Sequence, residues 1–378
     1  MHVVDMVFFW ARAEPHRLAL IQPEMVTTYQ GLADAIDSIG DRIDRLGLDT
    51  REPLAVSIAN PSFFLATVFA VLRCGFSVAL VTPPLYPHLR SAGIRNLIYD
   101  AQGQVMSGGR NVRFDMSWLP AAAASGGRVP YRHRPAGSGD MICLTSEATG
   151  APKAIVRSMA GLSRRVGSPL NCANGDHEKA LVLRGLAGGF GFDRACEMLH
   201  AGKAACFSPF GEAALMLIST FAIETVVASP QQALALADIQ KTARYDLPSL
   251  KTLRLEDALL SPDAARQIKT HLCRNIVVTY SSAEAGLTAA APYDVIADVP
   301  GAVGFLSPEV DVEVVDGAGK VLPAGSEGVI RLRAPQSAAN VGQPEIGGHG
   351  EWFYPGDIGR VTEEGVLCLT GRRSKSGA

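Results

Sequence analysis

The segment from Leu144 to Ser158, LTSEATGAPKAIVRS, carries hydroxyl, glycine and lysine residues in an order suited to holding phosphate. Hydroxyl groups donate hydrogen bonds, a glycine lets backbone amides approach an anion, and a lysine adds positive charge. The residues that offer these groups are Thr145, Ser146, Thr149, Gly150 and Lys153. The segment predicts a phosphate-binding loop between two strands, and an ordinary polar hairpin is the alternative.

Glu147 is the residue of this loop that opposes phosphate binding, because its carboxylate repels an anion. Two unit charges about 4 Å apart at an effective dielectric constant of about 20 interact by roughly 4 kcal/mol. An ordered Glu147 facing the phosphates would therefore weaken binding on the order of a thousandfold. An outward side chain, or a carboxylate that helps to hold Mg²⁺, would avoid this penalty, and the sequence leaves these arrangements open.

Motifs of several other enzyme classes are absent from the sequence. It contains no GxxxxGK[ST] Walker loop, no GxSxG elbow, no HExxH and no paired-cysteine metal site. The glycine-rich segment Gly185–Asp193 does not match the dinucleotide fingerprint, because Arg194 stands where the last glycine belongs. These absences exclude the common nucleotide-triphosphatase, hydrolase, metalloprotease and dehydrogenase signatures.

Composition favours a protein that acts on small molecules. The 378 residues predict a large core with a smaller appendage. The 35 Lys and Arg residues nearly balance 37 Asp and Glu residues, so no charge excess would attract nucleic acid or an anionic membrane. Seven cysteines without a CxxC pair indicate reduced thiols and a cytoplasmic location. The uncharged run Leu54–Leu72 is interrupted by Asn60 and Pro61, which predicts a strand and a helix, not a membrane span.

Alternating strands and helices are expected to position the loop. Strand-length apolar runs alternate with helical segments such as those begun by Asn60-Pro61 and Ser261-Pro262, which predicts parallel sheets covered by helices. Further along, period-two alternation around Asp316-Gly317 and Glu364-Gly365 predicts antiparallel hairpins. The expected fold is α/β, with layered parallel sheets in an αβαβα-type core and a smaller β-rich subdomain at the C-terminal end.

Several motifs occur in the order known from one family. TSEATGAPK resembles the loop TSGTTGxPK, TYSSAE resembles YGxTE, GAVGFLSPEVDVEVVD resembles GxxGxPxPxxxxxxxD, and WFYPGDIGRVTEEGVLCLTGR resembles WxxTGDxxxxxxDGxxxxxGR. Together they cover the chain from about Thr27 to Arg372. The sequence resembles the large N-terminal part of the adenylate-forming superfamily, which comprises acyl-CoA synthetases, luciferases and the adenylation domains of peptide synthetases.

The resemblance implies a division into three parts. Residues 1–299 would form the α/β core of the AMP-binding domain with two sheet subdomains, and residues 300–372 the β-rich subdomain. Residues 373–378 would be a remnant of a hinge, with Lys375 at the hinge position. In the family a small C-terminal domain follows, which carries the lysine for adenylation and the surface for thioester formation. The given sequence ends before such a domain, so we expect slow adenylate formation and weak thioester transfer unless this domain or a carrier protein acts in trans.

The implied activity is a two-step ligation. A small-molecule carboxylic acid attacks the α-phosphate of Mg-ATP to give an acyl-adenylate and pyrophosphate, and a thiol then displaces AMP. The implied cofactors are ATP and Mg²⁺, with coenzyme A or another thiol as acyl acceptor. Catalysis of this kind depends mainly on positioning and charge neutralisation.

The resemblance also implies residue roles. Lys153 and Glu284 would be catalytic, with Glu284 holding Mg²⁺, while Tyr280 would stack on adenine, Asp357 would bind the ribose hydroxyls and Arg372 would contact ribose or phosphate. The other implied nucleotide-binding positions are Thr145, Ser146, Glu147, Thr149, Gly150, Glu256, Asp257, Ala258, Ser281 and Ala283. The implied substrate pocket includes Ala187, Gly188, Gly189 and Phe190. The alternatives are a turn-capping Asp357, a solvated Glu284 and a buried strand aromatic at Tyr280.

The motifs depart from the family pattern at several positions of the nucleotide site. Glu147 and Ala148 replace Gly-Thr in the loop, and Ala283 replaces the threonine of YGxTE. Glu256 and Asp257 stand where the family has a glycine-rich segment against adenine. The favoured hypothesis is an acyl-CoA synthetase-like acid ligase with low or trans-dependent activity. A non-catalytic member that binds an acyl ligand or protein partner is a second hypothesis, and a standalone amino-acid adenylation domain is a third, which lacks an evident acid to grip an amino group.

Overall fold

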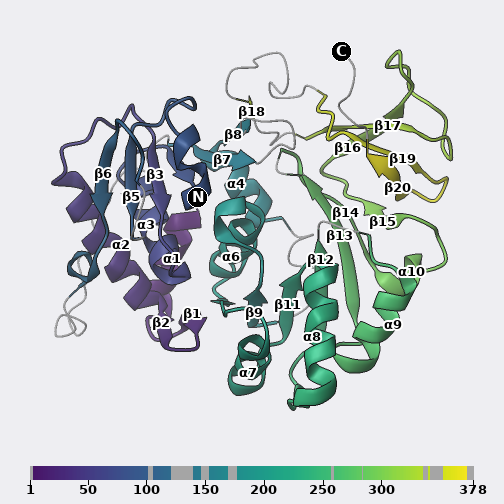
Figure 1. Ribbon diagram of the computed structural model, residues 1–378, viewed down its shortest axis with the longest axis horizontal. Helices are drawn as coiled ribbons and strands as arrows, with labels where there is room; N and C mark the ends of the chain where they lie inside the picture. Colours follow the sequence, from purple (N-terminus) through teal and green to yellow (C-terminus); the bar gives the residue numbers. More distant parts are fainter. Residues whose placement is uncertain are drawn as a thin grey trace. The chain divides into compact units, whose positions relative to one another are not determined.

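The computed structural model describes residues 3–100, 105–120, 139–145, 153–168, 177–256, 259–282, 284–334, 339–340 and 352–372. The chain divides into two compact units, and Figure 1 labels most of their helices and strands. Unit 1 comprises residues 1–172, 185–207 and 340–342, and unit 2 comprises residues 173–184, 208–339 and 343–378.

Unit 1 contains a mainly parallel sheet with the strand order β8-β7-β4-β3-β5-β6. All neighbours in this order pair in parallel except β7 and β8, which are antiparallel. Outside this sheet, β1 pairs in parallel with β10 and antiparallel with β2. The strands are β1 (Leu18–Gln22), β2 (Met25–Thr28), β3 (Leu54–Ser57), β4 (Val78–Leu80), β5 (Asn96–Tyr99), β6 (Arg110–Arg113), β7 (Met141–Thr145), β8 (Lys153–Arg157) and β10 (Ala204–Cys206), while β18 (Ala339–Asn340) has one residue in each unit.

Several helices of unit 1 begin at a residue whose side chain caps the helix. Asn60 accepts hydrogen bonds from the amides of Ser62 and Phe63, and Pro61 occupies the first turn, as the sequence predicts. The helix that follows is almost entirely buried. The helices are α1 (Val3–Ala13), α2 (Tyr29–Asp44), α3 (Pro61–Arg73), α4 (Met159–Val166) and α6 (Phe190–His200), with the 3₁₀ turns η1 (Pro83–His88), η2 (Met116–Trp118) and η4 (Leu186–Gly188).

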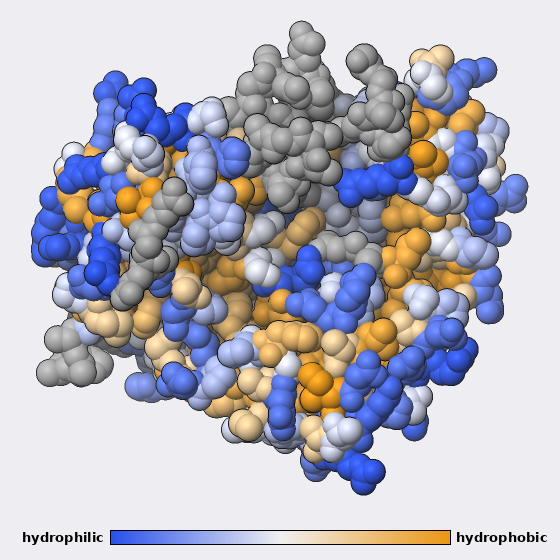
Figure 2. All heavy atoms as spheres, viewed as in Figure 1, coloured by the Kyte–Doolittle hydropathy of each residue, from blue (hydrophilic) through white to orange (hydrophobic). Residues whose placement is uncertain are grey.

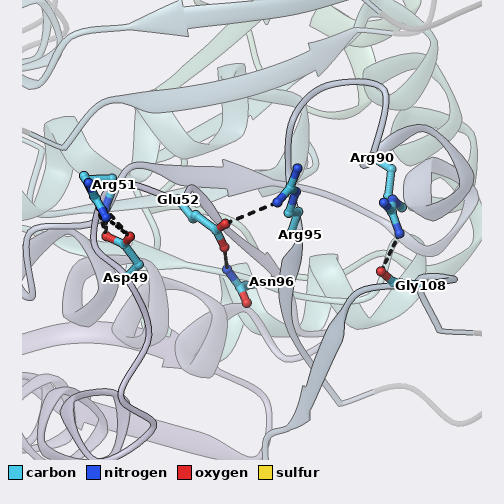
Figure 3. A network of polar contacts seen from close by, with 7 residues as sticks. All are labelled: Asp49, Arg51, Glu52, Arg90, Arg95, Asn96 and Gly108. Carbon is cyan, nitrogen blue, oxygen red and sulfur yellow. Dashed lines mark hydrogen bonds and ion pairs between the residues drawn. The ribbon is translucent and has the colours of Figure 1, made fainter.

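Polar contacts attach the loop before β3 to β5 (Figure 3). The Glu52 carboxylate accepts a hydrogen bond from Asn96 Nδ2 at 3.0 Å and lies 3.7 Å from Arg95 Nη1. In the same loop Arg51 Nη2 is 2.7 Å from the Asp49 carboxylate. Because exposed ion pairs contribute little free energy, these contacts mainly define the local path of the chain.

Unit 2 contains a sheet that changes from parallel to antiparallel pairing. The strand order is β9-β11-β12-β13-β14-β15-β20-β19-β17-β16. Pairing is parallel from β9 to β13 and antiparallel from β13 onward. The strands are β9 (Lys179–Val182), β11 (Thr225–Ala228), β12 (Thr252–Glu256), β13 (Ile276–Ser282), β14 (Gly286–Pro292), β15 (Ala302–Leu306), β16 (Asp311–Val315), β17 (Gly328–Arg333), β19 (Asp357–Val361) and β20 (Val366–Arg372).

Antiparallel pairing begins between β13 and β14, and the strands β15, β16, β17, β19 and β20 lie after residue 300, where the sequence predicts a β-rich part. The expected hairpins form between β16 and β17 and between β19 and β20. Ser261 caps its helix through the amide of Ala264, as predicted. The α/β fold class is therefore confirmed, and the exact domain boundaries stay a prediction. The helices of unit 2 are α7 (Glu212–Phe221), α8 (Pro230–Ala243), α9 (Pro262–His271) and α10 (Tyr293–Ile296).

Figure 2 shows one face of the structure, on which hydrophilic and apolar areas alternate. The large apolar side chains that are exposed include Phe210, Met216 and Val295. Within the part of the chain that the structure describes, no helix combines the length and the apolar character needed to cross a membrane.

Candidate functional site

Tyr280 and Asp357 form the central contact of the predicted nucleotide site in unit 2. Tyr280 lies on β13 and Asp357 begins β19, 77 residues later. The Tyr280 hydroxyl donates to Asp357 Oδ2 at 2.5 Å. Arg372, the partner of Asp357 in the β19–β20 ladder, has Nε 3.8 Å from Asp357 Oδ1. The structure thus brings together an aromatic ring, a carboxylate and a cation that the sequence predicts to share one site.

The backbone around these residues explains their placement. Gly356 has a φ of +90°, a conformation that favours glycine and turns the chain into β19 just before Asp357. On the other side, the register of β13 with β14 shifts between Tyr280 and Ser281. Such irregularities re-aim side chains at functional positions of a sheet.

The environment of Tyr280 keeps its hydroxyl protonated. Burial raises the pKa of Tyr280, and the neighbouring Asp357 carboxylate raises this pKa further. A protonated hydroxyl acts as a hydrogen-bond donor to Asp357 throughout the neutral pH range. The contact therefore fixes the orientation of the carboxylate without adding a charge.

Glu284 lies in the short connection between β13 and β14, with 7% of its surface exposed. Its negative charge contributes to the raised pKa of Tyr280, so the two groups share one electrostatic environment. The connection is held by the amide of Ala285, which donates to Ser282 Oγ at 2.9 Å. Ser281, whose hydroxyl is buried without a hydrogen-bond partner among the described residues, also lies at this end of β13. Ala283 lies outside the described residues.

Glu256 ends β12, which pairs in parallel with β13. It stands opposite Thr279, the residue before Tyr280, and is 1% exposed. Its Oε1 lies 3.3 Å from Nε of Arg254, which is equally buried and on the same face because residues two apart on a strand point the same way. Glu256 is therefore on the strand next to Tyr280, whereas Asp257 and Ala258 lie outside the described residues.

The strands of the predicted phosphate loop are present in unit 1. Thr145 ends β7 and Lys153 begins β8, and the two residues face each other in the antiparallel ladder. This arrangement confirms the predicted strands on both sides of the loop. The candidate loop residues Ser146, Glu147, Thr149 and Gly150 lie outside the described residues, and their roles stay predictions.

The predicted substrate-pocket segment forms η4 and the start of α6, with Ala187 and Gly188 in η4 and Phe190 as the first residue of α6. Gly189 joins the two elements with a φ of +85°. The conformation favours glycine, and a Cβ there would lie 3.2 Å from Cys143 Sγ and 3.3 Å from Arg157 Nη1, so these neighbours would have to move slightly. A Cβ at Gly188 would meet no atom within 4 Å.

A buried charged cluster contacts this segment, and sequence reasoning missed it. Arg157 on β8 forms an ion pair with Asp193 in the first turn of α6, and Arg165 Nη1 on α4 lies 3.8 Å from the same carboxylate oxygen. All three residues are more than nine-tenths buried. Burial by itself would lower the pKa of Arg157, but the Asp193 carboxylate outweighs it and raises that pKa. The only signal in the sequence is a charge within each of two apolar runs, which does not reveal that they pair.

The chain matches the AMP-binding enzyme family over residues 7–340. The chain belongs to the AMP-binding enzyme family. Feruloyl-CoA synthase from Amycolatopsis sp is 24% identical to this chain over 394 aligned residues. The alignment covers 96% of this chain and 77% of the synthase. The salicyl-AMP ligase / salicyl-S-ArCP synthetase of Mycobacterium tuberculosis is 24% identical over 96% of this chain and 71% of its own length.

A solved structure supports the same fold for this AMP-binding family member. O-succinylbenzoate coenzyme A synthetase from Bacillus subtilis, in complex with AMP, superposes with a TM-score of 0.83. The alignment has 16% identity and covers 97% of this chain and 78% of that structure. At this identity the likeness shows the fold alone. The predicted membership of the adenylate-forming superfamily is confirmed by the family match.

Proposed function

We propose that this AMP-binding family member binds an adenine nucleotide beside Tyr280 and Asp357 and uses it to activate a carboxylic acid. The observation that carries the proposal is the Tyr280–Asp357–Arg372 contact in unit 2. A carboxylate accepts hydrogen bonds from ribose hydroxyls, an aromatic ring offers a stacking face to a base, and an arginine suits phosphate. These are the groups that recognition of AMP requires.

The proposed reaction proceeds in two steps. A carboxylate oxygen of the acid forms a bond to the α-phosphorus of ATP while the bond to pyrophosphate breaks, which gives an acyl-adenylate. The sulfur of a thiol such as coenzyme A then bonds to the acyl carbon, and AMP leaves. Lys153, at the start of β8, would neutralise phosphate charge in the first step.

Glu284 is the proposed protein ligand for Mg²⁺, which would neutralise charge on the phosphates when bound. No group of three or more potential ligand side chains occurs among the described residues. This fits Mg²⁺, which commonly keeps several waters and binds through one or two carboxylates and the phosphates of its substrate. Glu284 is buried, and its carboxylate contributes to the raised pKa of Tyr280. It would therefore hold the ion beside the nucleotide.

The proposed substrate is an aromatic carboxylic acid. The names of the similar proteins include feruloyl-CoA synthase and salicyl-AMP ligase, both of which refer to aromatic acids. An amino acid is less compatible with this site, because the Asp193 carboxylate near the predicted pocket already faces Arg157 and Arg165. This cluster has no excess negative charge to attract an ammonium group.

We also propose that a C-terminal domain or carrier protein supplied in trans raises the activity.

A non-catalytic member of the family is the second candidate function. The observation that favours it is Glu256, a buried carboxylate on the strand next to Tyr280, where the family resemblance expects space for adenine. In this case the chain would bind an acyl ligand or a protein partner without nucleotide. Nucleotide titration separates the two functions.

The test is a calorimetric titration of the wild-type chain and Asp357→Ala with AMP and with Mg-ATP. Asp357→Ala should weaken both nucleotides at least tenfold, because charge-assisted hydrogen bonds contribute roughly 1.5 to 3 kcal/mol each. Asp311→Ala is the control, since Asp311 is an exposed acid of unit 2 that pairs with Arg333. Wild-type affinity in Asp357→Ala would remove this residue from the site. A wild-type chain that binds neither nucleotide would overturn the proposal and favour the non-catalytic function.

A further inference from the structure

Two functional segments of unit 1 meet at one buried cluster. Strands β7 and β8 flank the predicted phosphate loop, and residues 185–190, from the cap of η4 to the first residue of α6, form the predicted pocket segment. η4 packs against β7 and β4, and α6 packs against α4, the helix that follows β8. The elements that carry the loop therefore also support the pocket segment.

The Arg157–Asp193 ion pair joins β8 to α6. Arg157 is the last residue of β8, and Asp193 lies within the first turn of α6, where its amide donates to the Gly189 carbonyl at 2.9 Å. Arg157 Nη1 also lies 3.9 Å from Cys143 Sγ on β7. The side chain of one β8 residue thus contacts both β7 and the helix that follows the pocket segment.

Gly189 places the pocket segment close to the same guanidinium, since a Cβ at this position would lie 3.3 Å from Arg157 Nη1. Its missing side chain lets the backbone approach Cys143 and Arg157. A planar guanidinium with donors in a fixed fork defines orientation as well as distance. A small displacement of Arg157 would therefore also displace Gly189 and Asp193.

A gain in folding stability does not by itself explain why these two charged side chains are buried. Removing two charges from water is costly, and replacement of a buried ion pair by apolar residues is often neutral or stabilising. Buried ionic groups contribute conformational specificity in some proteins. Because this pair lies between β8 and the pocket segment, it would specify the position of the pocket segment relative to β8.

We propose that Arg157 and Asp193 are positioning residues that hold the pocket segment against the strand leaving the phosphate loop, so that nucleotide at the loop orders the pocket. The first part concerns the chain without ligands. The second part rests on the proposed nucleotide binding. Neither residue touches the reacting atoms in this scheme, and both act through the backbone of residues 185–190.

The first measurement is amide hydrogen exchange of the ligand-free chain, followed in peptides that cover residues 185–192. Arg157→Met combined with Asp193→Asn removes the ion pair while leaving no carboxylate unpaired, and Asn keeps the shape of Asp beside Arg165. Exchange in residues 185–192 should rise about tenfold, because the segment loses an attachment that limits local opening. Exchange within α8 of unit 2 should stay unchanged.

The matched control is Arg194→Met combined with Glu197→Gln. These residues form an ion pair of 2.6 Å within α6, and they are nearly as buried as Arg157 and Asp193. Their pair joins two positions of one helix and should leave exchange in residues 185–192 near the wild-type value. An equal rise in both double variants, or no rise in either, would overturn the positioning role.

The second measurement repeats the exchange with saturating Mg-ATP, a readout that a merely structural pair would not change. In the wild-type chain Mg-ATP should slow exchange both in peptides of β7 and β8 and in residues 185–192. In Arg157→Met with Asp193→Asn it should slow only the β7 and β8 peptides. Retained protection of residues 185–192 in this variant would overturn the transmission of nucleotide binding to the pocket.

Failure of the proposed function gives a different result from failure of the positioning role. If Mg-ATP slows no peptide of the wild-type chain, nucleotide binding and its transmission are both overturned, and the ligand-free comparison decides the attachment. If the double variant does not fold, Arg157→Lys replaces it, because lysine keeps the charge beside Asp193 but not the fork. Arg157→Lys should then show a smaller rise in the same residues, and wild-type exchange there would overturn the attachment.

Discussion

At Asp357 the two carboxylate oxygens have different neighbours. Oδ2 accepts the Tyr280 hydroxyl at 2.5 Å, and Oδ1 lies 3.8 Å from the Arg372 guanidinium. Each carboxylate oxygen can accept more than one hydrogen bond, so these contacts orient Asp357 without using its full capacity. The ring and the hydroxyl of Tyr280 therefore have separable roles, the ring toward a base and the hydroxyl toward Asp357.

Two substitutions of Tyr280 separate these roles. Tyr280→Phe keeps the ring and should weaken AMP binding by less than about tenfold, because a typical hydrogen bond contributes roughly 0.5 to 1.5 kcal/mol. Tyr280→Ala also removes the ring and should cost a further 1 to 3 kcal/mol, roughly, for a lost stacking contact with the base. Calorimetry with AMP gives both values. Equal losses would assign the whole effect to the hydroxyl, and an unchanged affinity in Tyr280→Ala would exclude the ring from the site.

The sequence predicts individual residues of this site but not their contacts. Tyr280, Asp357 and Arg372 follow from motif order, whereas the hydrogen bond between Tyr280 and Asp357 depends on strands 77 residues apart. Arg157 and Asp193 could not be predicted at all, since no local pattern distinguishes a buried charge from a solvated one before its partner is known. Pairing between distant residues is decided by tertiary structure.

The sequence predicts the ends of helices where the stabilising contact lies within a few residues. The predicted caps Asn60 and Ser261 form hydrogen bonds within three residues of their own positions. Sheet order was beyond such signals, because β15 pairs with both β14 and β20, and β20 is about sixty residues further along the chain. The alternation of elements therefore predicted the α/β class, and the order of strands required the structure.

Adjacent glycines at the start of α6 allow a test at this scale. Gly189→Ala should lower the free energy of unfolding by about 1 to 3 kcal/mol, because alanine is strained at a φ of +85° and its Cβ would crowd Cys143 and Arg157. Gly188→Ala is the matched control, since its Cβ would meet no atom within 4 Å. It should change stability by no more than about 0.5 kcal/mol. Urea unfolding gives both values, and equal effects would contradict the close packing at Gly189.

The chain carries nearly equal numbers of basic and acidic residues, 35 and 37, and its response to alkali also depends on buried titratable groups. Burial raises the pKa of Cys143 and of Cys196 above the ordinary value of 9.0. Burial and then Asp357 raise the pKa of Tyr280 above 10.0. In the folded chain these groups keep protons that the unfolded chain loses above these ordinary values. Their contribution to stability is therefore complete below about pH 9 and is lost as the pH rises above it.

The free energy of unfolding should consequently fall between about pH 8.5 and about pH 10.5, with each such group adding a slope of up to about 1.4 kcal/mol per pH unit. Urea titrations at several pH values measure this slope. Cys143→Ala should reduce it from about pH 9 upward, whereas Tyr280→Phe should reduce it only above about pH 10, because each variant removes one titrating group from the difference between folded and unfolded chains. Cys143 belongs to unit 1 and Tyr280 to unit 2, so the double variant should show the sum of the two reductions, as expected for independent sites. A wild-type slope in both single variants would mean that neither buried group holds its proton in the folded chain.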